Sequence, residues 1–560
     1  MNKNFAQTLY NLALNSPQKV AIVIAQADKE DTALDYQSLY QNACRYATFF
    51  TNLGIRKGDI LLLLLDHSID LVFIYWGAVL AGAIPSIQPY LTEKLQPDVF
   101  IKELEALIEF TKPKLIITYD RFNDEILTNL PQVKTKVPVI TSAFIAKSLS
   151  DITLTSYTGN ECEPDDIAII QHSSGTTGIK KGVALSHLAV FNQINAYSEA
   201  IKLCDSDVIV SWLPLYHDMG LIACFLLPIL SGISLVLMSP FDWVKSPVKL
   251  LTLVTRYKGT LTWLPNFAFN FLSKKIRDQE LDHIDLQTWR AVINCSEPVR
   301  FESMQLFQNR FKKHGLDPSA PSSCYAMAEN VFCVSQSSLY KPPIVDWIDP
   351  VQLTKDSLAK PRPFSEGGIP SVSSGKTLEN VQVRIIDGNF EPLPNRRIGE
   401  VAIRSNCLFT EYFNNPKATQ YAFKEDWYLT GDYGYLVDDE LFITGRKKDL
   451  IIVGGINIFP QDIENVITGM EGVYPGRVVA FGVPNENLGT EDVVVIAETE
   501  IQNPLVRENI AEAIRKNVTQ ETSVALRKVY VVNHGWLIKT SSGKLSRAAN
   551  RNKLLETIDN

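Results

Sequence analysis

A short segment rich in glycine and hydroxyl residues, HSSGTTGIKKG at residues 172–182, has the composition of a phosphate-binding loop. It follows the apolar run 167–170, and a helix is expected to begin near Ser186. Glycines let backbone N–H groups turn toward an anion, hydroxyl side chains add donors, and lysine adds charge. The candidate phosphate ligands are Ser173, Ser174, Gly175, Thr176, Thr177, Gly178 and Lys181.

Other phosphate and nucleophile motifs do not fit this sequence. The loop lacks the Gly-x4-Gly-Lys-Ser/Thr spacing of P-loop nucleotidases, and the Gly-Lys-Thr at 375–377 has Pro370 in place of the first glycine. No G-x-S-x-G segment occurs, so the nucleophile elbow of α/β-hydrolases is absent. By composition alone, an ordinary polar loop is an equal alternative to a phosphate cradle.

Five further segments follow the loop in a fixed order and decide between these alternatives. They are LPLYHDMG at 213–220, CYAMAE at 324–329, YLTGD at 428–432, GRKKDLI at 445–451 and KTSSGK at 539–544. Taken with the loop, this order resembles the adenylate-forming superfamily, which contains acyl-coenzyme A synthetases, peptide-synthetase adenylation domains and luciferases. The resemblance covers nearly the whole chain and implies ATP and Mg²⁺ as cofactors.

Within that superfamily, three stretches of the sequence resemble the fatty acyl-AMP ligases. The segments that carry this are PNFAFNFL at 265–272, LQTWRAVINCSEPVRFESMQLFQNRF at 286–311 and GGINIFPQDIE at 454–464. About 70 residues separate Glu329 from Gly399, and the segment at about 341–363 looks like the insertion that marks acyl-AMP ligases. We expect it to bias the lid, with Trp347 and Ile348 as apolar anchors. A surface elaboration without influence is the alternative.

The resemblance implies roles for the residues that would bind the nucleotide. Tyr325 is expected to stack on adenine and Asp432 to accept hydrogen bonds from the ribose, with Arg446 as a further donor. Glu329 is the expected Mg²⁺ ligand, since a carboxylate is a hard oxygen donor. The other wall of the adenine slot is expected to comprise Asn294, Ser296, Glu297 and Pro298.

Three residues are expected to act in catalysis or lid movement. Lys544 in the SSGK loop is the candidate catalytic cation, because a lysine is a mobile point charge. His217 is expected to steer the substrate carboxylate, and Lys448 to be the hinge of the lid. Without the resemblance, each would be interpreted as an ordinary surface or structural residue.

The elements that must position these residues predict an α/β fold. Apolar runs such as 60–65, 208–212 and 234–238 alternate with helical stretches, which is typical of parallel sheets with crossover helices. We therefore expect a large N-terminal domain of parallel or mixed sheets over 1–445, with a small β subdomain at about 380–445. A small α+β domain over 446–560 is expected to form a mobile C-terminal lid.

Composition narrows the class of protein. The 560-residue chain has a net charge of -8 and no basic run longer than Arg446-Lys447-Lys448, which argues against a nucleic-acid partner. The N-terminal segment has no signal-peptide pattern, and the scattered cysteines fit a reducing compartment, so a cytoplasmic enzyme is expected. Pro228 and Ser231-Gly232 interrupt the uncharged stretch 219–241, which predicts a buried helix, a turn and a core strand rather than integral membrane association.

Three functions remain open from the sequence. The first is activation of a fatty acid to its acyl-adenylate with transfer to an acyl carrier protein, a separate chain or synthase module. The second is an acyl-coenzyme A synthetase with the same first half-reaction, and the third is a non-catalytic nucleotide-binding relative. The superfamily pattern is broken at a few positions near the expected nucleotide, namely Lys180, Cys295, Ala326 and Asn330.

Overall fold

The structure is a computed structural model of the 560-residue chain. It describes residues 4–26, 29–90, 97–120, 122, 124, 137–152, 155–159, 161–172, 181–453, 456–485, 490–522, 524–540 and 544–558. The predicted loop residues Ser173, Ser174, Gly175, Thr176, Thr177 and Gly178 lie outside the described residues.

One long mixed sheet runs through the molecule. Its parallel strands are rich in β-branched residues and buried on both faces, as expected when helices cover a sheet. In the spatial order given next, the neighbouring strands from β18 to β13 pair antiparallel. In spatial order, the strands are β18 (Val381–Ile386), β19 (Gly399–Ser405), β22 (Trp427–Val437), β23 (Glu440–Arg446), β17 (Lys376–Thr377), β14 (Cys333–Gln336), β13 (Pro321–Ala326), β12 (Ala291–Asn294), β11 (Leu261–Leu264), β9 (Val208–Ser211), β10 (Ser234–Met238), β1 (Val20–Ala25) and β2 (Thr32–Asp35), with β21 (Phe423–Lys424) paired to β22.

Two smaller sheets lie beside it. The first is parallel, in the order β4 (Ile84–Ile87), β3 (Ile60–Leu63), β5 (Leu115–Thr118) and β6 (Val139–Thr141). The second is antiparallel, in the order β20 (Glu411–Tyr412), β8 (Gly182–Ser186) and β7 (Ile167–His172). The mixture of parallel sheets and connecting helices confirms the predicted α/β class.

Helices connect the strands of this N-terminal part. They are α1 (Phe5–Asn15), α2 (Tyr36–Asn52), α3 (Ile69–Leu80), α4 (Pro97–Thr111), α7 (Ser142–Ser148), α8 (His187–Ala200), α9 (Leu227–Ser231), α10 (Pro240–Lys245), α11 (Val248–Tyr257), α12 (Asn266–Lys275), α13 (Phe301–Phe311), α14 (Pro350–Asp356) and α15 (Pro416–Ala422). Between α13 and β18, the hairpin β15 (Val345–Ile348) and β16 (Ile369–Val372) flanks α14.

The uncharged stretch 219–241 is part of the core. A π-helical segment at Met219–Leu226 leads into α9, which ends at Gly232 with a φ of 75°, and β10 follows. A left-handed residue ends a helix at little cost when it is glycine. The predicted order of helix, turn and core strand is therefore correct. Among the described residues, no helix is both long and apolar enough to cross a bilayer.

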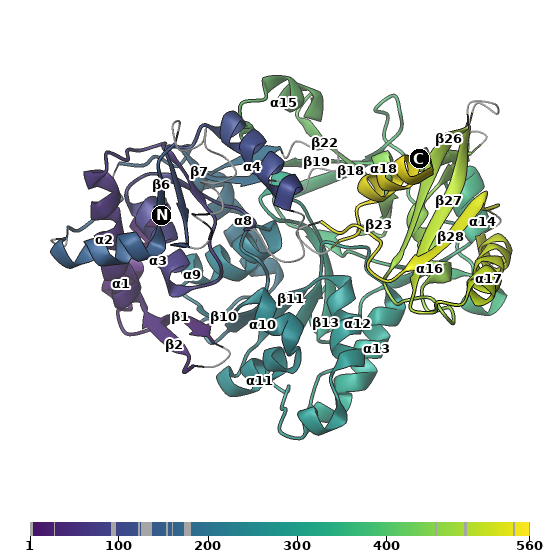
Figure 1. The fold of residues 1–560 in the computed structure, drawn as a ribbon, viewed down its shortest axis with the longest axis horizontal. Helices are drawn as coiled ribbons and strands as arrows, with labels where there is room; N and C mark the ends of the chain where they lie inside the picture. The colour runs from purple at the N-terminus through teal and green to yellow at the C-terminus, as the bar shows by residue number, and fades with distance from the viewer. Residues whose placement is uncertain are drawn as a thin grey trace.

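Residues beyond Arg446 have a hydrophobic core of their own, with buried side chains such as Ile463, Val495 and Ile514. Figure 1 shows these elements in green to yellow on the right, with the purple and blue N-terminal elements on the left. Their bounds are β24 (Ile451–Val453), β25 (Ile456–Ile458), α16 (Pro460–Ile467), β26 (Val478–Asn485), β27 (Thr490–Thr499), α17 (Pro504–Thr522), β28 (Lys528–Asn533) and α18 (Arg547–Ile558). We refer to this part as the C-terminal lobe.

Candidate active site

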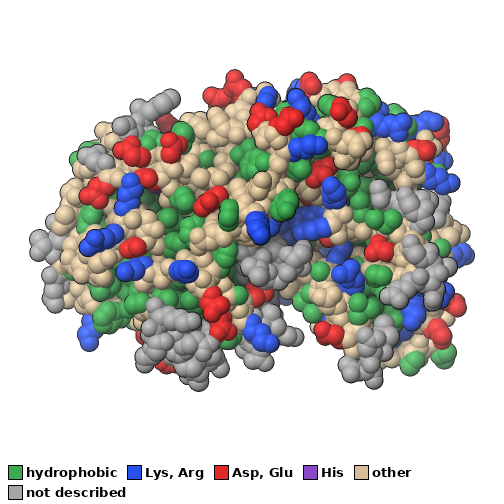
Figure 2. All heavy atoms as spheres, turned by 90° about the horizontal axis from the view of Figure 1, so that it is seen from above, with side chains coloured by type: hydrophobic (Ala, Val, Ile, Leu, Met, Phe, Trp, Pro, Cys, Tyr) green, Lys and Arg blue, Asp and Glu red, His purple; other side chains and the backbone are tan. Residues whose placement is uncertain are grey.

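A cleft of about 2890 Å³ is lined by residues of both lobes. Figure 2 shows the surface hollowed between the two lobes, with Lys and Arg side chains gathered near the boundary on this face. The lining of the cleft includes Ser296 and Lys544, and it also includes a set of apolar side chains to which we refer as the apolar branch. These are Leu65, Leu71, Trp212, Phe241, Trp243 and Phe271.

Three of the predicted nucleotide ligands lie close together on strands β13, β22 and β23 of the main sheet. The hydroxyl of Tyr325 donates to Oδ2 of Asp432 at 2.6 Å, and Nε of Arg446 lies 3.4 Å from Oδ1 of the same carboxylate. Asp432 and Arg446 are register partners on β22 and β23, so the antiparallel ladder brings them together. Asp432 raises the pKa of Arg446, which keeps the guanidinium charged.

The segment after β12 forms part of the cleft wall. Ser296, Glu297 and Pro298 line the cleft, and Ser296 has a φ of 68°, so the chain turns sharply here. Asn294 differs from the prediction, because its side chain is fully buried and donates to Oδ1 of Asn266 at 3.0 Å. Asn294 therefore supports the wall from behind and does not line the cleft.

The side chains of His217 and Lys544 meet although the two residues are 327 positions apart in the chain. Nζ of Lys544 lies 3.5 Å from Nε2 of His217, and Nδ1 of the same ring lies 2.5 Å from Oδ1 of Asp218. The carboxylate therefore orients the imidazole so that Nε2 faces the lysine. Burial disfavours the Asp218 anion, but His217 and Lys544 outweigh it, so the pKa of Asp218 is lowered.

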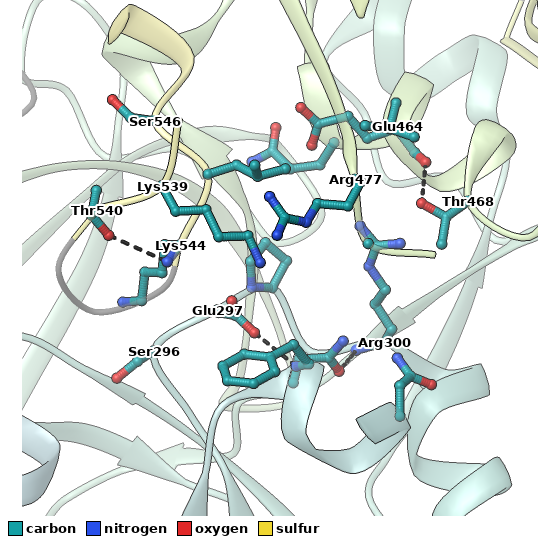
Figure 3. A pocket seen from close by; sticks show the side chains of 18 of the residues that line it. Ser296, Glu297, Arg300, Glu464, Thr468, Arg477, Lys539, Thr540, Lys544 and Ser546 are labelled. Atoms are coloured by element: carbon teal, nitrogen blue, oxygen red, sulfur yellow. Dashed lines mark hydrogen bonds between the residues drawn. The ribbon is translucent and has the colours of Figure 1, made fainter. Parts of the chain in front are cut away.

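Burial lowers the pKa of Lys544, and the charges of Glu297 and Asp218 partly oppose this change. Figure 3 shows Lys544, Thr540 and Lys539 reaching from the C-terminal lobe over Ser296 and Glu297 on the opposite wall. The backbone N–H of Lys544 donates to Oγ1 of Thr540 at 3.2 Å, which braces the loop. The cation is thus held in a desolvated position, where its effect on a nearby anion is strong.

Glu329 lies in a separate cluster with the end of the glycine-rich segment. The hydroxyl of Tyr412 donates to Oε1 of Glu329 at 2.9 Å, and Nζ of Lys181 lies 4.3 Å from the centre of the Tyr412 ring. β20 and β8 pair through Tyr412 and Val183, which brings these residues together. Burial raises the pKa of Glu329, so the site favours a cation that restores its charge.

The strands β7 and β8, which precede and follow the glycine-rich segment in the chain, pair antiparallel. His172 at the end of β7 pairs with Gly182 at the start of β8, and α8 begins only after β8, with Ser186 as its N-cap. The predicted helix start near Ser186 is correct, but the predicted order of strand, loop and helix is wrong. The residues Gly182–Ser186 form a strand because GVALS is apolar and pairs on both sides, with β7 and β20.

Lys448 lies in the turn Lys447–Asp449 between β23 and β24. Its neighbours are held by opposite lobes, since Lys447 lies 2.7 Å from Glu400 and Asp449 lies 2.9 Å from Arg547. Within the described part of the chain, Lys448 itself makes no ion pair. A short turn between two anchored neighbours is a suitable place for dihedral change.

The aromatic PNFAFNFL segment contributes to the cleft. Its residues Phe267 and Phe271 line the cleft, whereas the residues 221–226 are buried in the core and do not. The dominant feature is a stacked pair, Trp212 and Trp243, with ring centres 3.7 Å apart and planes inclined by 3°. The position of Trp212 directly before LPLYHDMG is a sequence signal that could have revealed it.

A comparison of the sequence with models of protein families assigns the chain to a family. The model of the AMP-binding enzyme family matches residues 10–413. The chain belongs to the AMP-binding enzyme family. The predictions of an enzyme and of the adenylate-forming superfamily are therefore confirmed.

Individual relatives refine the placement. A medium-chain-fatty-acid–[acyl-carrier-protein] ligase, JamA of Moorena producens, is 28% identical over 571 residues, which covers 98% of this chain and 95% of the relative. A Mycobacterium tuberculosis protein named as a fatty-acid–CoA ligase, fadD25, is 30% identical over 556 residues, covering 93% and 91%. A solved structure from a study of fatty acyl-adenylate ligases from E. coli and L. pneumophila superposes with a TM-score of 0.89 at 27% identity, covering 100% and 98%. The predicted resemblance of this AMP-binding enzyme to fatty acyl-AMP ligases is confirmed.

Replacing Glu329 by glutamine tests the metal ligand. A neutral amide holds Mg²⁺ less strongly than a carboxylate, so we expect the Mg²⁺ concentration for half-maximal pyrophosphate release to rise by roughly tenfold or more. Glu302→Gln on α13 removes an equal charge at a different cleft position and should leave the requirement unchanged. An unaltered Mg²⁺ requirement in the Glu329 variant would remove this residue from the metal site.

Asp462 predicts a pH dependence of stability. Burial, with a contribution from Glu464, raises the pKa of Asp462 to about 7, while Arg300 opposes the shift. A raised pKa means that the folded state favours the neutral acid, so the contribution of Asp462 to stability is most favourable below a pH of about 4 and is lost as pH rises to about 7. Asp462→Asn should therefore raise Tm by roughly 2–4 °C at pH 8 and change it little at pH 4. Equal Tm differences at both pH values in thermal denaturation would contradict this assignment.

Proposed function

We propose that the protein uses ATP to convert a fatty acid to its acyl-adenylate, and then transfers the acyl group to the phosphopantetheine thiol of an acyl carrier protein. The observation that carries the first step is the meeting of Lys544 and His217 beside an apolar branch. The named activities of JamA and of the fatty acyl-adenylate ligases with solved structures support the same substrate class.

In the first step, a carboxylate oxygen of the acid attacks the α-phosphorus of ATP, and the bond from phosphorus to pyrophosphate breaks. His217 orients the carboxylate, and Lys544 stabilises the negative charge that grows on the α-phosphate and acyl oxygens. Tyr325, Asp432 and Arg446 hold adenine and ribose. Lys181, with the 173–178 segment, receives the phosphates.

The donor set around Glu329 fits Mg²⁺, which takes one or two carboxylates and completes its coordination with phosphate oxygens and water. When bound, the ion neutralises charge on the departing pyrophosphate. Tyr412 keeps the Glu329 carboxylate oriented through its hydroxyl.

The second step requires a thiol to attack the acyl carbonyl, with AMP as the leaving group. We propose that residues 446–560 form a mobile lid hinged at Lys448, and that the present pose serves adenylation because Lys544 lies in the site. In this reading residues 1–445 form the N-terminal domain. The strands at 380–445 form its β subdomain, although β17 joins them to the main sheet.

The segment around 341–363 supports a carrier rather than coenzyme A as acceptor. Ile348 and Leu353 are buried in one hydrophobic cluster with Phe459 and Leu450 of the C-terminal lobe. α14 also contacts β25 and α17, and Figure 1 shows α14 beside α17. We propose that this contact holds the lid in the adenylation pose and restricts entry of free coenzyme A.

Trp347 acts differently from the expectation that it would anchor the lid. Its ring packs against Phe301 of α13 at 5.7 Å and against Phe364 at 5.1 Å, within the N-terminal part. The neighbouring Asp346 binds Arg396 at 2.9 Å and accepts from Tyr435 at 3.0 Å. The segment is therefore fixed to the N-terminal part by Trp347 and Asp346, while Ile348 faces the lobe beyond residue 446.

One product analysis tests the whole proposal. The intact protein is incubated with a fatty-acid panel, ATP, Mg²⁺, coenzyme A and a pantetheinylated carrier protein, and products are identified by mass spectrometry. We expect pyrophosphate, acyl-adenylate and acylated carrier, with little acyl-coenzyme A. Robust acyl-coenzyme A synthesis would favour the synthetase activity for which fadD25 is named, and no pyrophosphate with any acid would favour a non-catalytic relative.

A further inference from the structure

A buried polar atom lies beside the apolar branch of the cleft. His67 follows β3, directly before Ser68 at the N-cap of α3, and it lines the cleft together with Leu71 and Trp212. Its Nε2 atom is buried and has no hydrogen-bond partner among the described residues. A buried polar atom without a partner is unfavourable, which indicates that something else satisfies it when the branch is filled.

The protonation of His67 defines what that partner must be. The backbone carbonyl of Leu213 opposes the lowering of the pKa of the ring, and since Nε2 has no partner among the described residues, we assign the ring proton to Nδ1. Burial lowers the pKa of His67 to about 4, so the ring is neutral at physiological pH. With the proton on Nδ1, Nε2 presents a lone pair, and only a hydrogen-bond donor can satisfy it.

The neighbouring polar groups do not supply this donor. The hydroxyl of Tyr90 donates to Oδ1 of Asp66 at 2.7 Å, and the same oxygen accepts from the backbone N–H of His67 at 2.6 Å. Two potential donors in the branch are unused, because Nε1 of Trp212 and Nε1 of Trp243 are also buried without partners in the part of the chain that the structure describes. Among these described residues, the branch thus contains one free acceptor and two free donors beside apolar walls.

We propose that the apolar branch binds a hydroxylated acyl chain, with the chain hydroxyl donating to Nε2 of His67. A hydroxyl fits because it can donate to the imidazole and also accept from an indole N–H. A keto group offers no proton to Nε2, and an ammonium would bring a charge into an apolar space where the Asp66 carboxylate is already engaged. This inference rests on the proposed function and makes His67 a determinant of substrate specificity.

The test compares matched pairs of acids. Pyrophosphate release is measured for octanoic, dodecanoic and hexadecanoic acids and for derivatives with a hydroxyl at successive positions along each chain. We expect at least one hydroxy acid to exceed its parent in kcat/KM by about tenfold or more, since a site that hydrogen-bonds a substrate hydroxyl discriminates against the analogue that lacks it. Wild-type protein that favours no hydroxy acid over its parent would overturn the proposal.

Variants assign the preference to the histidine. In His67→Leu the ratio of kcat/KM for the preferred hydroxy acid and its parent should fall to about one, whereas His67→Gln keeps an acceptor oxygen and should retain part of the preference. His283→Leu, at an exposed position outside the cleft, should leave the ratio unchanged. A preference that persists in His67→Leu would overturn the assignment. Failure of every acid to release pyrophosphate would overturn the proposed function together with this inference.

Discussion

Pyrophosphate release should fall by about 10²–10³-fold when Lys544 is replaced by alanine, while ATP binding stays nearly intact. The reason is that Nζ of Lys544 is desolvated beside His217 and acts on charge that grows in the transition state. The nucleotide itself is expected to be held by other groups, including Tyr325 and Asp432. Isotope exchange or coupled pyrophosphate detection measures the rate, and calorimetry with ATP measures binding.

Lys516→Ala provides a matched control for this experiment. Lys516 is an exposed lysine on α17 of the same lobe and does not line the cleft, so its loss should leave the rate unchanged. Lys544→Arg would separate charge from fit, because a guanidinium keeps the charge but not the compact shape. A Lys544→Ala rate within about threefold of wild type would remove this residue from its proposed role.

Loosening the contact between α14 and the C-terminal lobe should raise acyl-coenzyme A formation by about tenfold. Leu353 is 4% exposed and shares a hydrophobic cluster with Phe459, so Leu353→Ala removes apolar contact between the lobes. Buried Leu→Ala changes commonly cost about 2–5 kcal/mol, and a shift of ~1.4 kcal/mol between two lid poses is already tenfold in population. Shortening the segment at 341–363 should act in the same direction.

Lys355→Ala controls for the substitution on α14, because Lys355 is exposed on the same helix. Product ratios from mass spectrometry give the readout, with adenylation measured in parallel to show that the variants remain folded. If Leu353→Ala and the shortened protein both make no more acyl-coenzyme A than wild type, the segment has no part in acceptor choice. Acyl transfer to the carrier protein then needs another explanation.

Local sequence patterns predicted the bounds of a strand well where the buried apolar run and the paired residues are the same. The strand at 234–238 was expected with the bounds that the structure has, because its apolar run ends at clear turn residues. The strand Gly182–Ser186 was missed, because the glycine-rich segment before it was expected to lead directly into the helix near Ser186. One of its two pairing partners, β20, lies more than 220 residues away in the chain, and the five residues alone do not indicate that pairing.

The same distinction holds for the candidate site. Family motifs identified Tyr325, Asp432, Arg446, His217 and Lys544 as candidate site residues. In the structure the first three lie close together, and so do the last two. The side chain of Asn294 and the rings of Trp347 and Trp243 could not be placed in this way. Which face a ring or an amide presents depends on packing between distant segments, and a motif does not contain that information.

The distance of 327 residues between His217 and Lys544 has a consequence for biosynthesis. A ribosome makes the N-terminal part first, and such parts generally fold as units while synthesis continues. Most of the residues proposed to hold the nucleotide, and the residues of the apolar branch, are therefore made before Lys544 has been translated. If Lys544 stabilises the charge of adenylation as proposed, a nascent or truncated chain forms no reactive acyl-adenylate before Lys544 has been added.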